Sequence, residues 1–190
     1  LHYFFRLLHT FFSFFLDDLE NGRKVASKNI AWRDQDGGIQ NAGNLAVVGE
    51  LAVLPFPYDD INSFKELHKI AYYESTRGCP FSCSYCLSGI SHYIRRKPLA
   101  KVLKELDKFI EADVPLVKFV DRTYNLGEDY YLPIMQHLAN RETKTLFHFE
   151  IKADLLSQNV LNFLKTVPKG RFQFEIGVQT TNQDTLKAIG

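Results

Sequence analysis

From residue 71 onward the sequence alternates between strand-like and helix-like segments, and this alternation limits the fold more than any other feature. Helices are predicted with Pro98 in the first turn, after Gly127, and after a capping Ser157. Alternating strands and helices build a parallel sheet with right-handed crossovers. The predicted fold class is therefore α/β, with four βα units that do not close a barrel by themselves. The four predicted strands span 71–76, 116–121, 145–151 and 171–179.

The last two predicted strands each have one apolar and one polar face. Phe147, Phe149 and Ile151 alternate with polar residues, and residues 171–179 repeat the pattern. Unpaired buried carboxylates cost several kcal/mol, so we expect the apolar faces to meet the helices and the polar faces to line a cavity. A sheet with one face open to solvent is the alternative. The residues that alternate with the apolar ones on these two strands are His148, Glu150, Lys152, Gln173, Glu175, Gly177 and Gln179.

Residues 1–70 have a different character. The aromatic stretch 1–16 is shorter than the roughly 20 residues that a membrane helix needs, so we expect a helix packed on a neighbouring domain, with an interfacial helix as the alternative. A Gly-Gly turn at 37–38 predicts a hairpin between 29–33 and 39–41. We therefore interpret 1–70 as an N-terminal helix and extended connector from an upstream domain, and 71–190 as a core truncated at its C-terminus.

All three cysteines of the chain lie within eight residues, directly after the first predicted strand. Cys79, Cys83 and Cys86 have the spacing C-x3-C-x2-C. An odd number of clustered cysteines argues against a disulfide framework and favours a reduced, metal-binding loop in a cytoplasmic protein. The loop follows a parallel strand, at the edge where α/β folds bind ligands. The net charge of +1 gives no sign of a nucleic-acid-binding surface.

Three thiolates leave one position of a metal centre without a protein ligand. A 4Fe–4S cluster in an electron-transfer protein normally has four protein ligands, so three would leave one iron open for chemistry. The spacing alone also allows a structural zinc site with His68 or His92 as the fourth ligand, or thiols that bind no metal. The βα series around the loop favours the cluster.

Four segments together resemble one family. They are 73–88 (YESTRGCPFSCSYCLS), 117–125 (VKFVDRTYN), 147–156 (FHFEIKADLL) and 172–179 (FQFEIGVQ). They resemble the radical S-adenosylmethionine (SAM) superfamily, and most closely radical SAM proteins of the Fe–S oxidoreductase type that carry an N-terminal cobalamin-binding domain. The resemblance covers about residues 30–190. It implies that this chain forms part of a (β/α)6 TIM-like barrel and is a fragment of a longer protein.

The resemblance also implies a reaction. The open iron chelates SAM, and one electron from a donor such as flavodoxin or ferredoxin cleaves SAM to methionine and a 5′-deoxyadenosyl radical. The radical serves hydrogen abstraction, or methyl or methylthio transfer, on a substrate that the sequence does not identify. The sequence lacks a D-x-H-x-x-G motif, so cobalamin is expected only in the full-length protein and not from this chain. An Fe–S electron-transfer protein or a zinc-binding module is the alternative.

Five residues are candidate cofactor or substrate contacts beside the three metal ligands. The family motifs give three of them, Asp121, Glu150 and Gln179. Glu175 is the fourth, because it shares the polar side of the strand, and Tyr85 is the fifth. Tyr85 is expected to lie against the adenine, with core packing as the alternative. Asp121 also suits a turn or capping role. Arg77 is expected to pair with a strand carboxylate or with the carboxylate of the cofactor, and Arg95 and Arg96 to lie on a solvated face.

Overall fold

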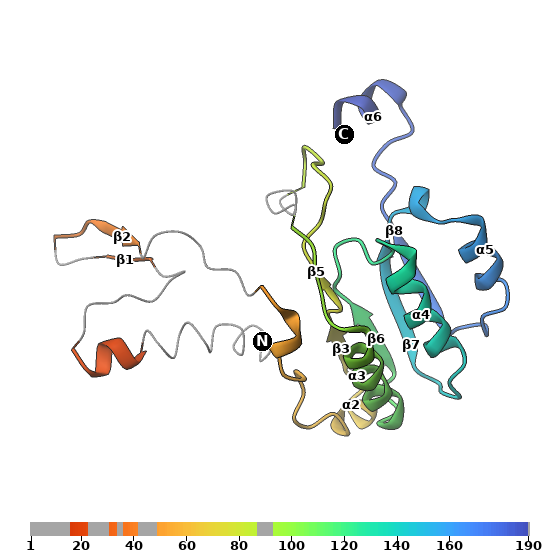
Figure 1. Ribbon diagram of the computed structural model, residues 1–190, viewed down its shortest axis with the longest axis horizontal. Coiled ribbons are helices and arrows are strands. Elements are labelled where there is room, and N and C mark those ends of the chain that lie inside the picture. Colours follow the sequence, from red (N-terminus) through yellow and green to blue (C-terminus); the bar gives the residue numbers. More distant parts are fainter. Residues whose placement is uncertain (1–15, 23–30, 34–35, 42–48, 87–92, 190) are drawn as a thin grey trace. The chain divides into compact units, whose positions relative to one another are not determined.

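The computed structural model describes residues 16–22, 31–33, 36–41, 49–86 and 93–189. The chain divides into two compact units, one of 1–49 with 53–59 and one of 50–52 with 60–190 (Figure 1). In the first unit, β1 (Ala31–Arg33) and β2 (Ile39–Asn41) pair antiparallel, which confirms the predicted hairpin. The helix predicted at 1–16 lies outside the described residues except for its last position. The predicted domain boundary at residue 70 stays a prediction.

The second unit contains a four-stranded parallel sheet in the order β3-β6-β7-β8. This arrangement confirms the predicted α/β fold with four βα units. Three strands end earlier than predicted, because β3 stops at Tyr73, β6 at Phe119 and β8 at Ile176. Gln179 therefore lies beyond the sheet. The strands are β3 (Ile70–Tyr73), β6 (Leu116–Phe119), β7 (Leu146–Ile151) and β8 (Phe172–Ile176).

The helices follow the signals in the sequence. Ser157 caps α5, and its hydroxyl accepts a hydrogen bond from the Val160 amide at 3.2 Å. Gly127 precedes α4 with a φ of 79°. No helix among the described residues is long and apolar enough to cross a membrane. The helices of this unit are α2 (Ser63–Glu66), α3 (Leu99–Glu111), α4 (Glu128–Ala139), α5 (Gln158–Leu164) and α6 (Gln183–Ile189), with 3-10 turns at Leu51–Val53 and Ala153–Leu155.

The core lies between the sheet and the helices α3 and α4, which cover one face of it (Figure 1). An aromatic cluster fills this layer, with ring centroids 5.4 Å apart for Tyr73 and Phe119 and 4.8 Å for Phe119 and Phe149. Tyr124 joins the cluster at 4.3 Å from Phe149. Phe147 and Phe149 are fully buried and Ile151 is nearly so. The prediction that the apolar face of the third strand meets the helices is confirmed.

The first predicted strand is divided in two. After β3 the chain turns at Glu74 and Ser75 and enters a second, very short strand, β4 (Thr76–Arg77), which pairs antiparallel with β5 (Arg95–Arg96). The cysteines lie in the segment between β4 and β5. The two short strands therefore form the stem of the cysteine loop, and the loop starts and ends at neighbouring points of the fold.

Candidate functional site

The stem of the cysteine loop brings its two ends into close contact. Thr76 pairs with Arg96 and Arg77 with Arg95. Gly78 follows with a φ of 104°, and a Cβ at this position would lie 2.2 Å from the Tyr93 carbonyl oxygen. Both the backbone conformation and the lack of space require glycine here. The chain thus reaches Cys79 from a fixed direction.

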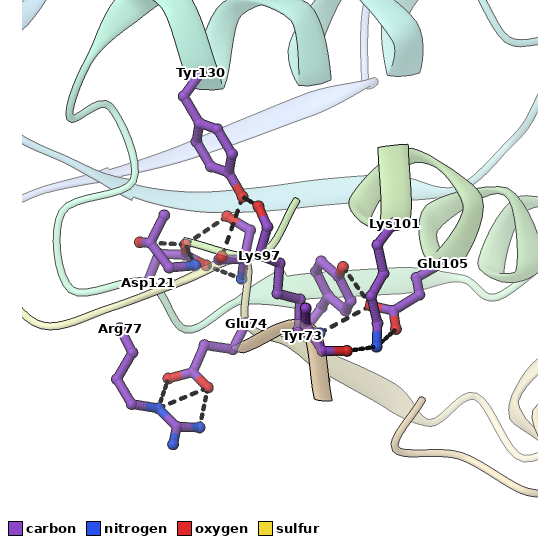
Figure 2. A network of polar contacts seen from close by, with 11 residues as sticks. Tyr73, Glu74, Arg77, Lys97, Lys101, Glu105, Asp121 and Tyr130 are labelled. Atoms are coloured by element: carbon purple, nitrogen blue, oxygen red, sulfur yellow. Dashed lines mark hydrogen bonds and ion pairs between the residues drawn. The ribbon is translucent and has the colours of Figure 1, made fainter. Parts of the chain in front are cut away.

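The side chain of Asp121 anchors the start of the stem through hydrogen bonds (Figure 2). Its fully buried carboxylate accepts hydrogen bonds from both the amide and the hydroxyl of Ser75, at 3.0 and 2.6 Å. It accepts two more from Thr76, at 2.5 Å from the amide and 2.6 Å from the hydroxyl. Burial raises the pKa of Asp121 to about 6, although these hydrogen bonds oppose the shift. A cofactor contact stays a prediction for Asp121, but its four bonds give it a role in fixing the loop.

Hydrogen bonds to backbone carbonyls tie the end of the stem to its start. The Lys97 amide donates to the Ser75 carbonyl at 2.9 Å. The Tyr130 hydroxyl, from α4, lies 2.8 Å from the Lys97 carbonyl and 3.2 Å from the Ser75 carbonyl (Figure 2). Burial raises the pKa of Tyr130, so the hydroxyl remains a hydrogen-bond donor at neutral pH. One side chain of α4 therefore holds both ends of the stem.

A buried ion pair secures the same end to α3. The Lys97 ammonium lies 2.8 Å from a Glu105 carboxylate oxygen, and the two side chains are 1% and 5% exposed. The Tyr73 hydroxyl donates to the same oxygen at 2.7 Å, and the Lys97 ammonium lies 4.4 Å from the centre of the Tyr73 ring. Lys101 approaches the other oxygen at 3.8 Å. The Glu105 carboxylate therefore has a lysine near each of its oxygens and accepts two hydrogen bonds on one of them, which offsets the cost of burying its charge.

The three cysteines differ in exposure along the loop. Cys79 is buried, Cys83 is half-buried and Cys86 is exposed, and none of them forms a disulfide. The Cys79 sulfur lies 3.6 Å from the Thr123 hydroxyl. Tyr85 is 55% exposed, and its pKa is raised by desolvation and by the neighbouring Cys83 and Cys86. Tyr85 thus lies beside Cys83 and Cys86, whereas Cys79 is the buried cysteine of the loop.

The donor set of this loop fits an iron–sulfur cluster. It consists of thiols, the ligand type that such clusters use. Within the described part of the chain no three His, Cys, Asp or Glu side chains are gathered closely enough to hold a metal ion, so the thiols would converge when a cluster binds. Of the two histidines proposed for zinc, His68 is exposed and is not gathered with the cysteines. His92 lies outside the described residues.

The uncovered face of the sheet carries a second group of charges, which we call the polar face: Lys118, His148, Glu150 and Glu175. The Lys118 ammonium lies 3.6 Å from Glu150 and 3.2 Å from Glu175, and His148 Nε2 lies 3.3 Å from Glu175. Desolvation lowers the pKa of Lys118, but Glu175 and Glu150 raise it by more. The structure therefore brings Glu150 and Glu175 together through one lysine.

Sequence reasoning missed Lys118 as a member of this group. In the structure Lys118 pairs with His148, and His148 pairs with Gln173, on adjacent parallel strands. The alternation of side chains along the second predicted strand is the sequence signal that could have placed Lys118 on this face. The side chain of Glu175 is 58% exposed, and that of Glu150 is 35% exposed. Gln179 is exposed beyond β8. Whether these residues contact a cofactor stays a prediction.

The arginines near the loop are placed differently from one another. Arg77 pairs with Glu74, and its Nε lies 2.9 Å from a carboxylate oxygen. Of the two partners expected for Arg77, this is the carboxylate of the predicted first strand. The expectation of a solvated Arg95 and Arg96 was wrong for Arg95, which is only 9% exposed because it lies in the stem. Arg96 is exposed but lies 5.1 Å from the centre of the Tyr130 ring and donates to the Leu126 carbonyl.

Residues 73–190 match the model of one protein family, the radical SAM superfamily. The chain therefore belongs to this superfamily, as the cysteine loop and the strand motifs predict. No curated protein sequence matches the chain.

The solved structures that share its fold include those of two radical S-adenosylmethionine proteins. One is the cobalamin-dependent S-adenosylmethionine radical enzyme OxsB, with a TM-score of 0.71 and 22% identity over 93% of this chain. The other is the radical S-adenosylmethionine methyltransferase TsrM from Kitasatospora setae, with a TM-score of 0.68 and 12% identity over 94% of this chain. The chain spans only 28% of OxsB and 37% of TsrM. At this identity the similarity shows a common fold.

Proposed function

We propose that this chain is part of the catalytic core of a radical SAM enzyme, in which Cys79, Cys83 and Cys86 hold a 4Fe–4S cluster with one iron left open for SAM. One observation carries the proposal. The C-x3-C-x2-C loop starts at the carboxyl end of β3, lies within the family match, and rests on a stem fixed by buried Asp121, Tyr130 and Lys97. A fixed stem supports a cluster ligand set at a defined position over the sheet edge.

The bound cluster would supply one electron, received from a donor of the flavodoxin or ferredoxin type, to cleave SAM into methionine and a 5′-deoxyadenosyl radical. Cys79 is the innermost ligand and Cys86 the outermost. The exposed ring of Tyr85 lies beside the two outer cysteines and offers a surface for the adenine. Three reduced thiols favour a reducing compartment, in keeping with a cytoplasmic protein.

The polar face would bind polar groups of SAM or of the substrate. Glu150 and Glu175 are partly exposed and share Lys118, so a ligand amine can replace the ammonium on either carboxylate. Gln179 and Asp121 complete the proposed set, Gln179 from the segment after β8 and Asp121 chiefly by holding the loop. The substrate could be modified by hydrogen abstraction or by methyl or methylthio transfer. Since the sequence lacks D-x-H-x-x-G, we assign no cobalamin to this chain.

Anaerobic reconstitution with iron and sulfide, followed by electron paramagnetic resonance of the reduced protein, tests the proposal. We expect the chain to take up a cluster whose signal changes when SAM is added. Cys79→Ser, Cys83→Ser and Cys86→Ser should each lose the signal, whereas Ser84→Ala, a matched change in the same loop, should keep it. A cluster signal that SAM does not alter would favour an electron-transfer protein. Zinc retention without iron uptake would favour a zinc module.

A further inference from the structure

One hydroxyl contacts a cysteine of the proposed cluster site, and nothing in the proposed function assigns it a role. Thr123 Oγ1 lies 3.6 Å from the sulfur of Cys79, within the distance of a hydrogen bond to sulfur. Cys79 is the only one of the three cysteines that is buried. The inference that follows rests on the proposed function, because it concerns a cluster bound to this sulfur.

Binding of a cluster would fix the direction of this hydrogen bond. In the free thiol, either the sulfur or the oxygen can donate the proton. A cluster ligand is a thiolate, which has lost its proton and can only accept. Thr123 must then be the donor, so its hydroxyl directs a partial positive charge at the sulfur of Cys79.

The segment that carries Thr123 is held on both sides. Two residues before it, Asp121 makes its four bonds to the stem of the loop. Directly after it, the Tyr124 amide donates to the Glu150 carbonyl at 2.9 Å, and the Tyr124 ring lies in the aromatic core. Next, the Asn125 side chain donates to the Lys152 carbonyl at 2.8 Å and accepts from the Lys152 amide at 2.9 Å. Thr123 is therefore presented by a rigid turn.

The backbone that leads into Cys79 is also held in place. Gly78, which precedes it, is packed against the Tyr93 backbone in a conformation that other residues rarely adopt. The stem below it is secured by the Lys97 and Tyr130 contacts. Because Thr123 and Cys79 both follow backbone that is held in place, their contact at 3.6 Å is a feature of the loop and not of a loose end.

We propose that Thr123 tunes the reduction potential of the cluster by donating a hydrogen bond to the Cys79 sulfur. Reduction adds one negative charge to the cluster and its ligands. A donor to a ligand sulfur stabilises the reduced form more than the oxidised form and raises the potential. The effect is larger at a buried sulfur, because water does not screen it there. Thr123 is thus a tuning residue that acts through Cys79.

A redox titration of the reconstituted chain, monitored by electron paramagnetic resonance, tests this role. Thr123→Val keeps the shape but removes the donor, and we expect a more negative midpoint potential. Thr123→Ala removes the donor without a new methyl group and should shift the potential in the same direction. Thr123→Ser restores a donor and should return the potential close to the wild-type value. Thr166→Val, a hydroxyl deletion at the exposed end of α5, is the control and should change nothing.

Two results would overturn the inference. One is a loaded Thr123→Val protein with the wild-type potential. The other is a Thr123→Ser protein that shifts as far as Thr123→Val, because the hydroxyl would then not be responsible. Failure of the wild-type chain to take up any cluster is a different outcome. It would contradict the proposed function itself, and the role of Thr123 would fall with it.

Discussion

The stem of the cysteine loop and the polar face of the sheet both carry charges, but they hold them in opposite ways. At the stem, Asp121, Lys97 and Glu105 are buried and each has several partners. On the polar face, Glu150 and Glu175 are partly exposed and depend mainly on Lys118. Buried, fully satisfied groups fix a geometry, whereas exposed charges can exchange one partner for another. The stem thus fixes the position of the loop, whereas the carboxylates of the polar face stay partly exposed beside a shared lysine.

Removal of one partner of the buried pair should have the largest effect on stability. Lys97→Met removes the closest counter-charge of the buried Glu105 carboxylate and leaves only the Lys101 ammonium at 3.8 Å, so we expect a loss of about 3–5 kcal/mol in the free energy of unfolding. Denaturant titration measures it. The double variant Lys97→Met with Glu105→Leu should recover part of the loss. Equal losses for Lys97→Met and for Lys118→Met would contradict the distinction between the buried charges of the stem and the partly exposed charges of the polar face.

The burial of Asp121 should make the free energy of unfolding depend on pH. Its pKa of about 6 lies above the ordinary 3.8, so folding favours the protonated form. The stability contributed by this group is complete below pH 3.8 and is lost as the pH rises through 6. At about 1.4 kcal/mol per pH unit, the difference in unfolding free energy between wild type and Asp121→Asn should fall by about 3 kcal/mol over this range. A difference that does not vary with pH would contradict the account.

Gly78 provides a test of the stem that involves no charge. Gly78→Ala combines a positive φ with a Cβ only 2.2 Å from the Tyr93 carbonyl, and we expect a loss of about 2–3 kcal/mol. Gly170→Ala is the matched control, because Gly170 also has a positive φ but has open space around its Cβ position. It should cost only about 1 kcal/mol. Thermal unfolding of both variants would show whether the close approach matters beyond the backbone conformation.

The polar face should give the smallest change in stability. Lys118→Met breaks contacts with two partly exposed carboxylates, so we expect a loss below about 1 kcal/mol. Its effect should lie in binding, because the carboxylates lose the cation that they share. Isothermal titration of the reconstituted protein with SAM should show altered affinity. A large loss of stability with unchanged affinity would assign the polar face to the scaffold.

The sequence predicted the local secondary-structure elements well. The four strands, the capping Ser157 and the helix from Leu99 follow from periodicity and end signals, which depend on neighbouring residues. The division of the first strand was missed, because residues 71–76 read as one continuous strand and the pairing of Thr76 with Arg96 joins positions 20 apart. The four bonds of Asp121 join residues 45 and 46 apart.

Thr123 and Lys118, which sequence reasoning missed, also have partners that are distant in the sequence. Thr123 lies within the 117–125 segment, but the resemblance of that segment assigns it no role, and its contact with Cys79 arises only when the end of β6 comes beside the end of β3. Lys118 could have been aligned with Glu150 from strand alternation, since both lie on the uncovered face of adjacent strands. Long-range pairing of polar side chains is set by the tertiary fold, and one sequence does not reveal it.

Our proposal requires the loop to hold a cluster with one iron open to SAM. Electron–nuclear double resonance on the reduced, reconstituted chain, with SAM labelled with ¹⁵N at its amino group, tests this claim most directly. We predict a ¹⁵N hyperfine coupling in the wild-type protein and in Ser84→Ala, because the amino nitrogen would bind the open iron. A reduced cluster that shows no ¹⁵N coupling with saturating SAM would contradict it.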